Sequence, residues 1–568
     1  MVIFQKLDYY VIITLNLYIC IKFVISRKML KHIFHSQTKT ITSAAFILGA
    51  TTLLSKILGL LRDRLLAGRF GAGDELDMYY AAFRIPDFVF NILIIGAISA
   101  AFIPVFASVW ERSQKEAWQV SNGVLNLFLS SLIFLSIILI LFCPLLISII
   151  APGFEGEKKE ISVALTRIMF LSPIFLAVSN ILSGILQSFR RFLVYSLAPI
   201  MYNIGIIIGI LSFVPKFGIY GLAWGVVLGA FLHMIIQIPS ARFCGYRYRF
   251  VFDIYNSGVR KIIKLMIPRT IGLGASQINL IVITAIASTL ASGSIAIFNL
   301  ANNLQYIPIG IIGISFATAV FPSLSQEFAS ERKEEFVKKF SSAFRQVLIL
   351  IIPLSALMFI LRAQIVRIIL GTGEFTWADT RLTAAALGIF ALGIFAQSLI
   401  PLVSKAFYAL HNTVIPVAIS IISIVLNIGF SFLFVWLLTF DNFFHNFIFE
   451  NLRLEGIEQI AVLSLPLAFS IAGIFNFALL FFALYKKVGD FDFKAILRYT
   501  LKILMATLIM AEVVYLGLYI LADFVNMKTF FGVFLQATGA MFIGLFAFAL
   551  IARFLKLYDF KKLSGLLR

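Results

Sequence analysis

The chain has 568 residues, of which 61% are hydrophobic and 13% charged, and its formal net charge is +20. Soluble domains are apolar over roughly half of their residues, so this composition excludes a soluble globular protein and predicts an all-α polytopic membrane protein. Basic loops on one side of a membrane account for the charge, and because no finger motif occurs we expect no nucleic-acid partner.

Residues 1–40 form an N-terminal extension with two open interpretations. Residues 9–25 are apolar enough for a marginal span, and Arg27, Lys28 and Lys31 follow them. The segment lacks the small-residue cleavage site of a signal peptide. Met29 is a second plausible start, so residues 1–28 are either a genuine element or a mis-called start.

From Ile41 onward, 14 apolar segments are near the length that crosses about 30 Å of hydrocarbon. They centre on residues 41–61, 80–106, 124–150, 161–186, 192–214, 218–238, 265–290, 304–324, 344–361, 384–404, 414–438, 461–485, 495–521 and 530–554.

The loop charges predict the orientation of these segments. Lys and Arg accumulate in cytoplasmic loops. With the N-terminus inside, the basic clusters at 242–264 and 332–339 lie in the cytoplasm, and the acidic loops near Glu155 and at 441–458 lie outside. We therefore expect both termini to be cytoplasmic.

An internal repeat relates the two halves. When the chain is shifted by about 218 residues, GAISAAFIPVFAS at Gly96 falls over GISFATAVFPSLS at Gly313, which predicts two six-span lobes in a parallel repeat with substrate between them. Chance alignment of apolar segments is the alternative. The repeat predicts an N-lobe at 41–240, a cytoplasmic basic linker at 241–264, a C-lobe at 265–486, and two further spans with a cytoplasmic tail at 487–568.

Charged residues within the first two spans are the best functional clue. Lys56 and Arg62 lie six residues apart in the first, and Arg84 and Asp87 lie near the start of the second. A charge at bilayer depth costs about 2.5 to 3.5 kcal/mol on insertion scales and normally faces a polar passage. Alternatively, Arg62 extends to the interface, and Arg84 and Asp87 neutralise each other.

Three stretches resemble the MurJ (MviN) lipid II flippases of the multidrug/oligosaccharidyl-lipid/polysaccharide exporter superfamily. They are SKILGLLRDRLLAGRFGAGDELDMYYAAFRIPD at Ser55, YGLAWGVVLGAFLHMIIQIP at Tyr220 and KAFYALHNTVIP at Lys405. The resemblance runs from Thr40 to Arg568. It implies two six-helix lobes plus a terminal helix pair. It also implies a monomer in the bacterial inner membrane that works beside cell-wall synthesis enzymes. Such a protein serves peptidoglycan biosynthesis, and so cell-wall growth and cell shape.

The same resemblance implies a binding site for the substrate. The basic pair of the family's first span falls on Lys56, where the family commonly has Arg, and on Arg62, and the acidic residue of the next turn falls on Asp77. Arg269 is a further basic candidate, beside Arg84. These cations are expected to hold the pyrophosphate of an undecaprenyl-linked substrate.

Some positions depart from the family pattern. Phe90 and Asn91 stand where many flippases carry adjacent arginines, and Asn303 and Tyr306 stand where the family often has an Arg and a Glu. Ile283 lies near the position of a sodium ligand proposed in relatives, so sodium coupling at that site is not supported. We expect a less charged cavity, in which Asn303 donates hydrogen bonds.

The sequence therefore predicts a flippase that moves lipid II from the inner to the outer leaflet by alternating access. The cysteine and histidine spacings indicate no disulfide framework and no metal site. We expect no catalytic residues, no enzymatic activity and no cofactor, since no Walker loop or catalytic triad occurs; the membrane potential or an ion gradient would contribute. Alternatives are a polysaccharide-lipid flippase, a cation-coupled multidrug exporter or a non-transporting scaffold.

Overall fold

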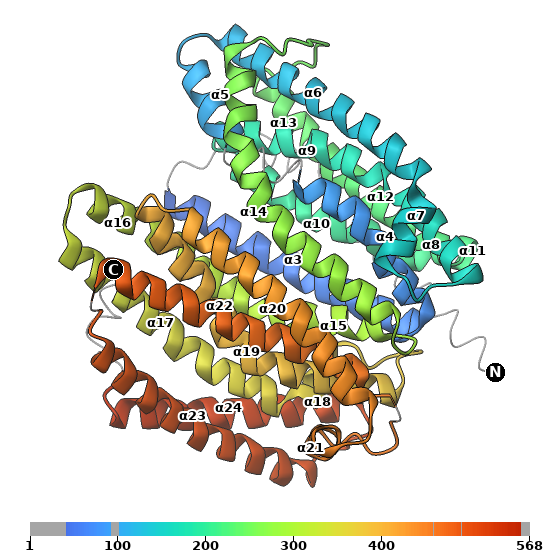
Figure 1. The fold of residues 1–568 in the computed structure, drawn as a ribbon, viewed down its shortest axis with the longest axis vertical. Coiled ribbons are helices and arrows are strands. Elements are labelled where there is room, and N and C mark those ends of the chain that lie inside the picture. Colours follow the sequence, from blue (N-terminus) through green and yellow to red (C-terminus); the bar gives the residue numbers. More distant parts are fainter. Residues whose placement is uncertain (1–40, 93–100, 458, 490, 558–568) are drawn as a thin grey trace. The chain divides into compact units, whose positions relative to one another are not determined.

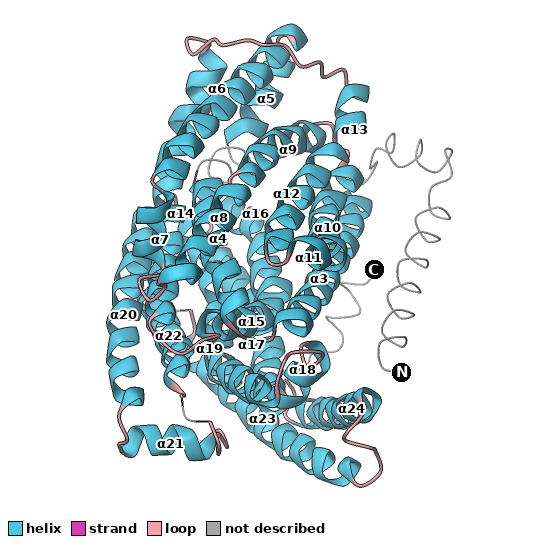
Figure 2. Cartoon of the chain, turned by 90° about the vertical axis from the view of Figure 1, so that its right-hand side faces the viewer, coloured by secondary structure: helices cyan, strands magenta, loops and turns pink. Residues whose placement is uncertain are grey.

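A computed structural model describes residues 41–92, 101–457, 459–489 and 491–557. The N-terminal extension 1–40, with its two possible starts, and the end of the cytoplasmic tail lie outside the described residues. Every regular element in the described ranges is a helix (Figures 1 and 2). The prediction of an all-α membrane protein is confirmed.

Eleven helical segments within the described residues are long and apolar enough to cross a membrane. They coincide with eleven of the fourteen segments expected from the sequence. The other three, at 41–61, 80–106 and 265–290, are not among them: the segment 80–106 includes residues 93–100, which are not described, and the other two include residues whose side chains are not described. The count of fourteen therefore stays a prediction.

The chain forms two compact units, each assembled from separate stretches. The first contains the chain up to Gly59, Pro86–Leu141 and Arg167–Ile271, and the second contains Leu60–Ile85, Phe142–Thr166 and the chain from Gly272. Helices α3 (Ile41–Phe70), α4 (Asp74–Phe90), α8 (Gly156–Met169) and α14 (Ser257–Ser288) each contain a boundary between them. The lobes proposed from the internal repeat stay a prediction.

Close backbone packing characterises the first unit. Its helices are α5 (Ile103–Trp110), α6 (Gln114–Leu141), α9 (Leu171–Ser188), α10 (Phe192–Ile208), the π-helix η3 (Gly209–Phe213), α11 (Val214–Phe217), α12 (Tyr220–Ile235) and α13 (Ile238–Phe243). A Cβ on Gly205 would lie 2.3 Å from the Gly229 Cα, and one on Gly209 would lie 2.4 Å from the Gly225 Cα. Such small residues let two membrane helices approach without intervening side chains.

The second unit is built around one buried helix, α19 (Trp377–Ala409). It also contains α7 (Cys143–Ile150), α15 (Ser294–Pro308), the π-helix η4 (Ile309–Ile314), α16 (Ser315–Ala329), α17 (Lys333–Ile360), α18 (Arg362–Ile369), α20 (Val414–Thr439), α21 (Phe443–Asn451), the 3₁₀-helix η5 (Ala461–Leu463), α22 (Ser464–Val488), α23 (Phe493–Ala522) and α24 (Phe530–Phe554).

The turn between α3 and α4 is fastened to the start of α19. Gly71 has φ +64°, and the Ala72 N–H donates to the Asp379 carboxylate (3.3 Å), which also caps α19 together with Thr376. The Gly68 carbonyl accepts from the Glu374 N–H at 2.9 Å. These bonds hold the end of α3 and the beginning of α4 against the rest of the second unit.

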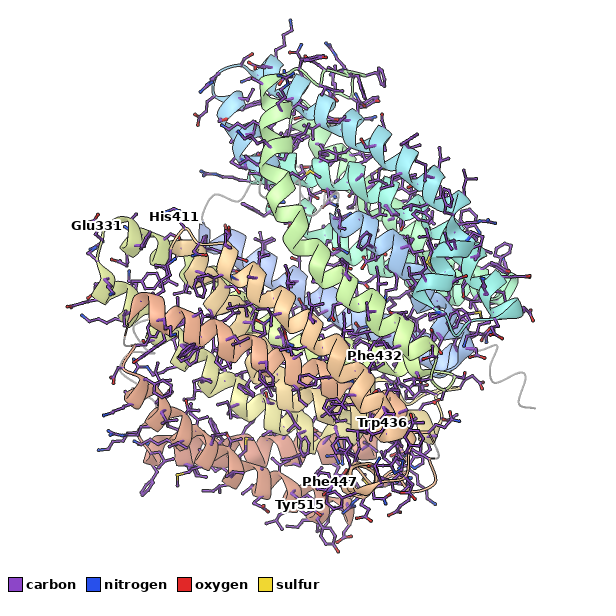
Figure 3. All side chains as sticks on the ribbon, in the orientation of Figure 1. Glu331, His411, Phe432, Trp436, Phe447 and Tyr515 are labelled. Carbon is purple, nitrogen blue, oxygen red and sulfur yellow. The ribbon has the colours of Figure 1, made fainter. Side chains whose placement is uncertain are left out.

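Large apolar side chains project outward from this unit. Phe432 and Trp436 on α20 and Tyr515 on α23 are all exposed (Figure 3). Hydrocarbon is as apolar as these side chains, so their exposure is favourable only if lipid surrounds the helices. The surface therefore agrees with a multi-pass membrane protein.

Candidate functional site

Arg62 is paired with an aspartate that the sequence analysis did not consider. In the part of α3 that belongs to the second unit, Arg62 Nη2 lies 2.8 Å and Nε 3.0 Å from Oδ1 of Asp63. The other oxygen of Asp63 accepts a hydrogen bond from Asn303 Nδ2 of α15 at 3.0 Å. The Asp63 side chain is 6% exposed and that of Arg62 is 23% exposed. The carboxylate therefore orients the guanidinium while part of it stays accessible.

Arg84 is held by two buried neutral side chains. Its Nε donates to Thr284 Oγ1 on α14 at 2.8 Å, and its Nη2 donates to Asn299 Oδ1 on α15 at 2.6 Å. These bonds fix the direction of the guanidinium. Asp87 belongs to the first unit, so its proposed pairing with Arg84 stays a hypothesis.

One face of α15 brings the two arginines into the same group. Asn299 and Asn303 are four residues apart, so their side chains lie one above the other on the helix. One contacts Arg84 and the other contacts Asp63. We call Arg62, Asp63, Arg84, Asn299 and Asn303 the α15 cluster; it contains two guanidinium groups and one carboxylate.

Tyr80 adds a hydroxyl to this group that the sequence analysis missed. It lies on α4 one turn before Arg84. Its hydroxyl interacts electrostatically with the charged groups of Asp63, Arg62 and Arg84. Its buried hydroxyl has no hydrogen-bond partner among the residues that the structure describes. A buried donor without a partner costs about 1 to 3 kcal/mol, so this hydroxyl is available to a ligand.

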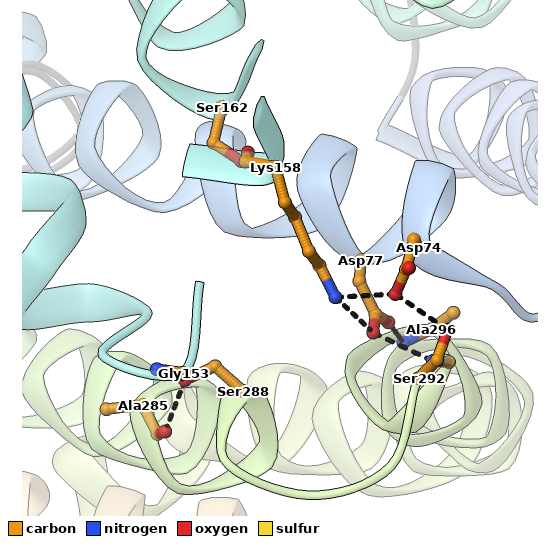
Figure 4. A network of polar contacts seen from close by, with 10 residues as sticks. Asp74, Asp77, Gly153, Lys158, Ser162, Ala285, Ser288, Ser292 and Ala296 are labelled. Carbon is orange, nitrogen blue, oxygen red and sulfur yellow. Dashed lines mark hydrogen bonds and ion pairs between the residues drawn. The ribbon is translucent and has the colours of Figure 1, made fainter. Parts of the chain in front are cut away.

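Asp77 lies at the other end of α15, in a second polar network (Figure 4). Its Oδ2 accepts from the Gly293 N–H and its Oδ1 from the Ala296 N–H, both at 2.8 Å. Because Asp77 is 1% exposed, these bonds form a buried cap on α15. Asp77 contacts the first turn of α15, whereas Asn299 and Asn303 lie on its second and third turns, so Asp77 is described as part of a separate network.

Lys158 of α8 and Asp74 complete this network. Lys158 Nζ lies 2.6 Å from Asp74 Oδ1 and 3.9 Å from Asp77 Oδ2, and Ser292 Oγ donates to Asp74 Oδ1 at 2.6 Å (Figure 4). We call Asp74, Asp77, Lys158 and Ser292 the acidic clasp. It fastens the beginnings of α4, α8 and α15 to one another.

The remaining predicted site residues lie elsewhere. Lys56 is half-buried on the part of α3 that belongs to the first unit, where the preceding Ser55 accepts hydrogen bonds from Asn203 of α10 (3.3 and 3.4 Å). Arg269 lies on α14, but its side chain is outside the described residues. Within the described ranges, no group of three His, Cys, Asp or Glu residues is arranged to hold a metal ion.

The fold is similar to that of a known class of membrane proteins. A multidrug resistance MATE family transporter of the MOP superfamily, in its inward-facing conformation, matches with a TM-score of 0.62 at 14% identity, covering 77% of this chain and 95% of that one. At that identity the likeness shows the fold alone: this chain has the fold of MOP superfamily transporters.

The family follows from closer matches. The family model "Lipid II flippase MurJ" matches residues 66–535. A solved structure, "Lipid II flippase MurJ, inward closed conformation", matches with a TM-score of 0.72 at 27% identity over 90% of this chain and 99% of that one. The chain belongs to the lipid II flippase MurJ family, and the resemblance noted in the sequence is confirmed.

Curated relatives agree with this assignment. The "Probable lipid II flippase MurJ" of Buchnera aphidicola subsp. Schizaphis graminum is 33% identical over 83% of this chain and 88% of its own length. The "Lipid II flippase MurJ" of Burkholderia cenocepacia is 28% identical over 65% of this chain and 73% of its own length.

Proposed function

We propose that this protein moves lipid II, the undecaprenyl-pyrophosphate-linked precursor of peptidoglycan, from the inner to the outer leaflet of a bacterial cytoplasmic membrane by alternating access. Membership of the MurJ family supports the substrate class. The α15 cluster is the observation that carries the proposal, because it offers an arginine that is oriented by a carboxylate and partly accessible. An anionic pyrophosphate that leaves water needs such a partner.

Each member of the cluster has a role in this proposal. Arg62 donates two parallel hydrogen bonds to two phosphate oxygens, because the planar guanidinium matches the spacing of those oxygens. Asp63 holds the guanidinium in position and is itself held by Asn303. Arg84 contributes a second positive charge, and the Tyr80 hydroxyl donates to a phosphate oxygen. Lys56 and Arg269 are proposed as further cations along the substrate's path.

Transport in this scheme needs no chemical reaction and no cofactor, and the chain acts as a monomer with both termini in the cytoplasm. The polyprenyl tail stays in lipid while the headgroup crosses. An inside-negative membrane potential contributes about 2.3 kcal/mol per charge per 100 mV to the outward movement of an anion. The potential therefore assists each transport cycle even without a coupled ion.

The alternative functions are less well supported. A cation-coupled drug exporter would need an acidic site, whereas the α15 cluster has two arginines for one aspartate. A flippase for another polyprenyl-pyrophosphate glycan would use the same phosphate contacts, so the cluster alone does not separate it from lipid II.

The test is depletion of the protein in a cell that depends on it, with an impermeant lipid II-binding antibiotic as the surface probe. Lipid II should accumulate while its outer-leaflet fraction falls, and a plasmid copy of this chain should restore the outer pool. If a different polyprenyl-linked glycan accumulates and surface lipid II is unchanged, the substrate assignment is wrong.

A further inference from the structure

An extended segment of the first unit displays alternating basic and aromatic side chains. It joins α13 to α14 and has the sequence YRYRFVFDIY over residues 246–255. We call it the basic-aromatic strap. It begins three residues after the candidate span Tyr220–Phe243 ends, and a helix that spans the bilayer there would place the strap near the lipid headgroups.

Two buried asparagines on α6 hold the backbone of the strap. Asn126 Nδ2 donates to the carbonyls of Arg249 (3.2 Å) and Val251 (3.0 Å), and Asn122 Nδ2 donates to the carbonyl of Arg247 (3.2 Å). Both asparagines are 2% exposed and lie one helical turn apart. The strap is therefore fixed in an extended conformation along α6.

Tyrosine hydroxyls and a capping turn complete this attachment. The hydroxyls of Tyr246 and Tyr248 donate to the side-chain oxygens of Asn122 and Asn126, both at 2.9 Å. At the other end, Asp253 Oδ1 accepts from the Tyr255 N–H at 3.0 Å in a turn that precedes α14. These bonds anchor the backbone while leaving most of the strap's other side chains outside.

The exposed side chains of the strap are aromatic and basic. Phe250 is 76% and Tyr255 81% exposed, and Arg247 and Arg249 are also exposed. The Arg260 guanidinium lies 5.0 Å from the centre of the Tyr255 ring, which extends the pattern into α14. Within residues 242–264 the bases are Arg242, Arg247, Arg249, Arg260, Lys261 and Lys264, against the single acid Asp253. The surface suits an anionic partner with an apolar layer beneath it.

We propose that the basic-aromatic strap binds the anionic phospholipid headgroups of the leaflet beside it. Arginine forks match phosphate geometry, and aromatic rings favour the boundary between headgroups and acyl chains. Anionic lipid attracts juxtamembrane basic residues, and a strap next to a span always has that surface within reach. Because the strap is already attached to α6, little backbone conformational entropy is lost on binding. By the orientation proposed above, this leaflet is the cytoplasmic one.

The test uses the full-length chain with its three cysteines replaced by alanine and a nitroxide attached at Phe252→Cys, or at Phe250→Cys if the first variant does not fold. The protein is placed in nanodiscs of phosphatidylcholine alone or mixed with phosphatidylglycerol. Accessibility to oxygen, which enters lipid, is compared with accessibility to a water-soluble nickel chelate. A nitroxide at Glu331→Cys, an exposed position outside the strap, is the control label.

Anionic lipid should lower nickel accessibility and raise oxygen accessibility at the strap label, with no change at the control label. In Arg247→Gln/Arg249→Gln, the phosphatidylglycerol fraction that gives half the effect should rise about fivefold for each arginine removed. Lys333→Gln/Lys338→Gln removes the same charge elsewhere and should leave the response unchanged. High salt should weaken it by screening.

Three results would overturn the proposal. The first is an identical response of the strap label in neutral and anionic nanodiscs. The second is an arginine variant that keeps the wild-type response. A label shielded from both reagents in every lipid would show that protein, rather than lipid, covers the strap.

Discussion

Replacing Asp77 tests whether the acidic clasp stabilises the second unit as its geometry implies. In Asp77→Ala the Gly293 and Ala296 N–H groups lose their acceptors in a buried place. Each unsatisfied donor costs about 1 to 3 kcal/mol, so the loss is about 2 to 6 kcal/mol. Asp77→Asn keeps one acceptor oxygen and loses the charge, and should cost roughly half as much.

The assay is thermal unfolding of the purified full-length protein in one detergent, with Asp74→Asn as the matched control. The Asp74 side chain is 54% exposed, so its ion pair with Lys158 contributes at most about 1 kcal/mol. The unfolding temperature should fall in the order wild type, Asp74→Asn, Asp77→Asn, Asp77→Ala. A wild-type melting curve for Asp77→Ala would refute the reasoning, as would equal losses in the two asparagine variants.

Three further predictions concern single residues. Tyr80→Phe should slow lipid II transport without lowering the unfolding temperature, because the hydroxyl that it removes has no partner among the described residues; a lower unfolding temperature would assign it a structural role. Gly205→Ala should cost about 1 to 3 kcal/mol because its Cβ meets backbone, while Gly49→Ala, with nothing within 4 Å, should unfold like wild type; equal curves would contradict the α10–α12 packing. Burial raises the pKa of the Cys244 thiol, so less of the reactive thiolate is present at a given pH. The rate of maleimide labelling at Cys244 should therefore rise at a higher pH than the rate at an exposed cysteine introduced by Glu331→Cys, and coincident pH profiles would contradict that burial.

Elements that depend on local composition could be predicted from the sequence. Continuous apolar runs in the sequence coincide with the eleven helical segments that are long and apolar enough to cross a bilayer, because length and hydropathy are local properties of the chain. Arg62 and Arg84 could be identified as candidate site residues from the sequence because charged side chains are costly, and therefore rare, within apolar segments that enter a bilayer. Asp77 was found only through its match to the family motif.

Partnerships between distant segments could not be predicted. Asp63 neighbours Arg62 in sequence, but its second contact, Asn303, lies 240 residues away on α15. Asp77 caps α15 across 216 residues to Gly293. The Tyr-Arg alternation at 246–249 was interpreted only as charge, because nothing local shows that Asn122 and Asn126 hold that segment extended. Such contacts depend on which helices pack together.

The central claim is that the Arg62 guanidinium holds the pyrophosphate of lipid II. The most direct measurement is the affinity of purified full-length protein in nanodiscs for lipid II, compared among wild type, Arg62→Ala and Arg62→Lys. Loss of a charged hydrogen-bonded pair is worth about 1.5 to 3 kcal/mol, so Arg62→Ala should bind about 10-fold to 150-fold more weakly. Arg62→Lys should recover only part, because a point charge lacks the fork. Wild-type affinity in a correctly folded Arg62→Ala protein would contradict the account.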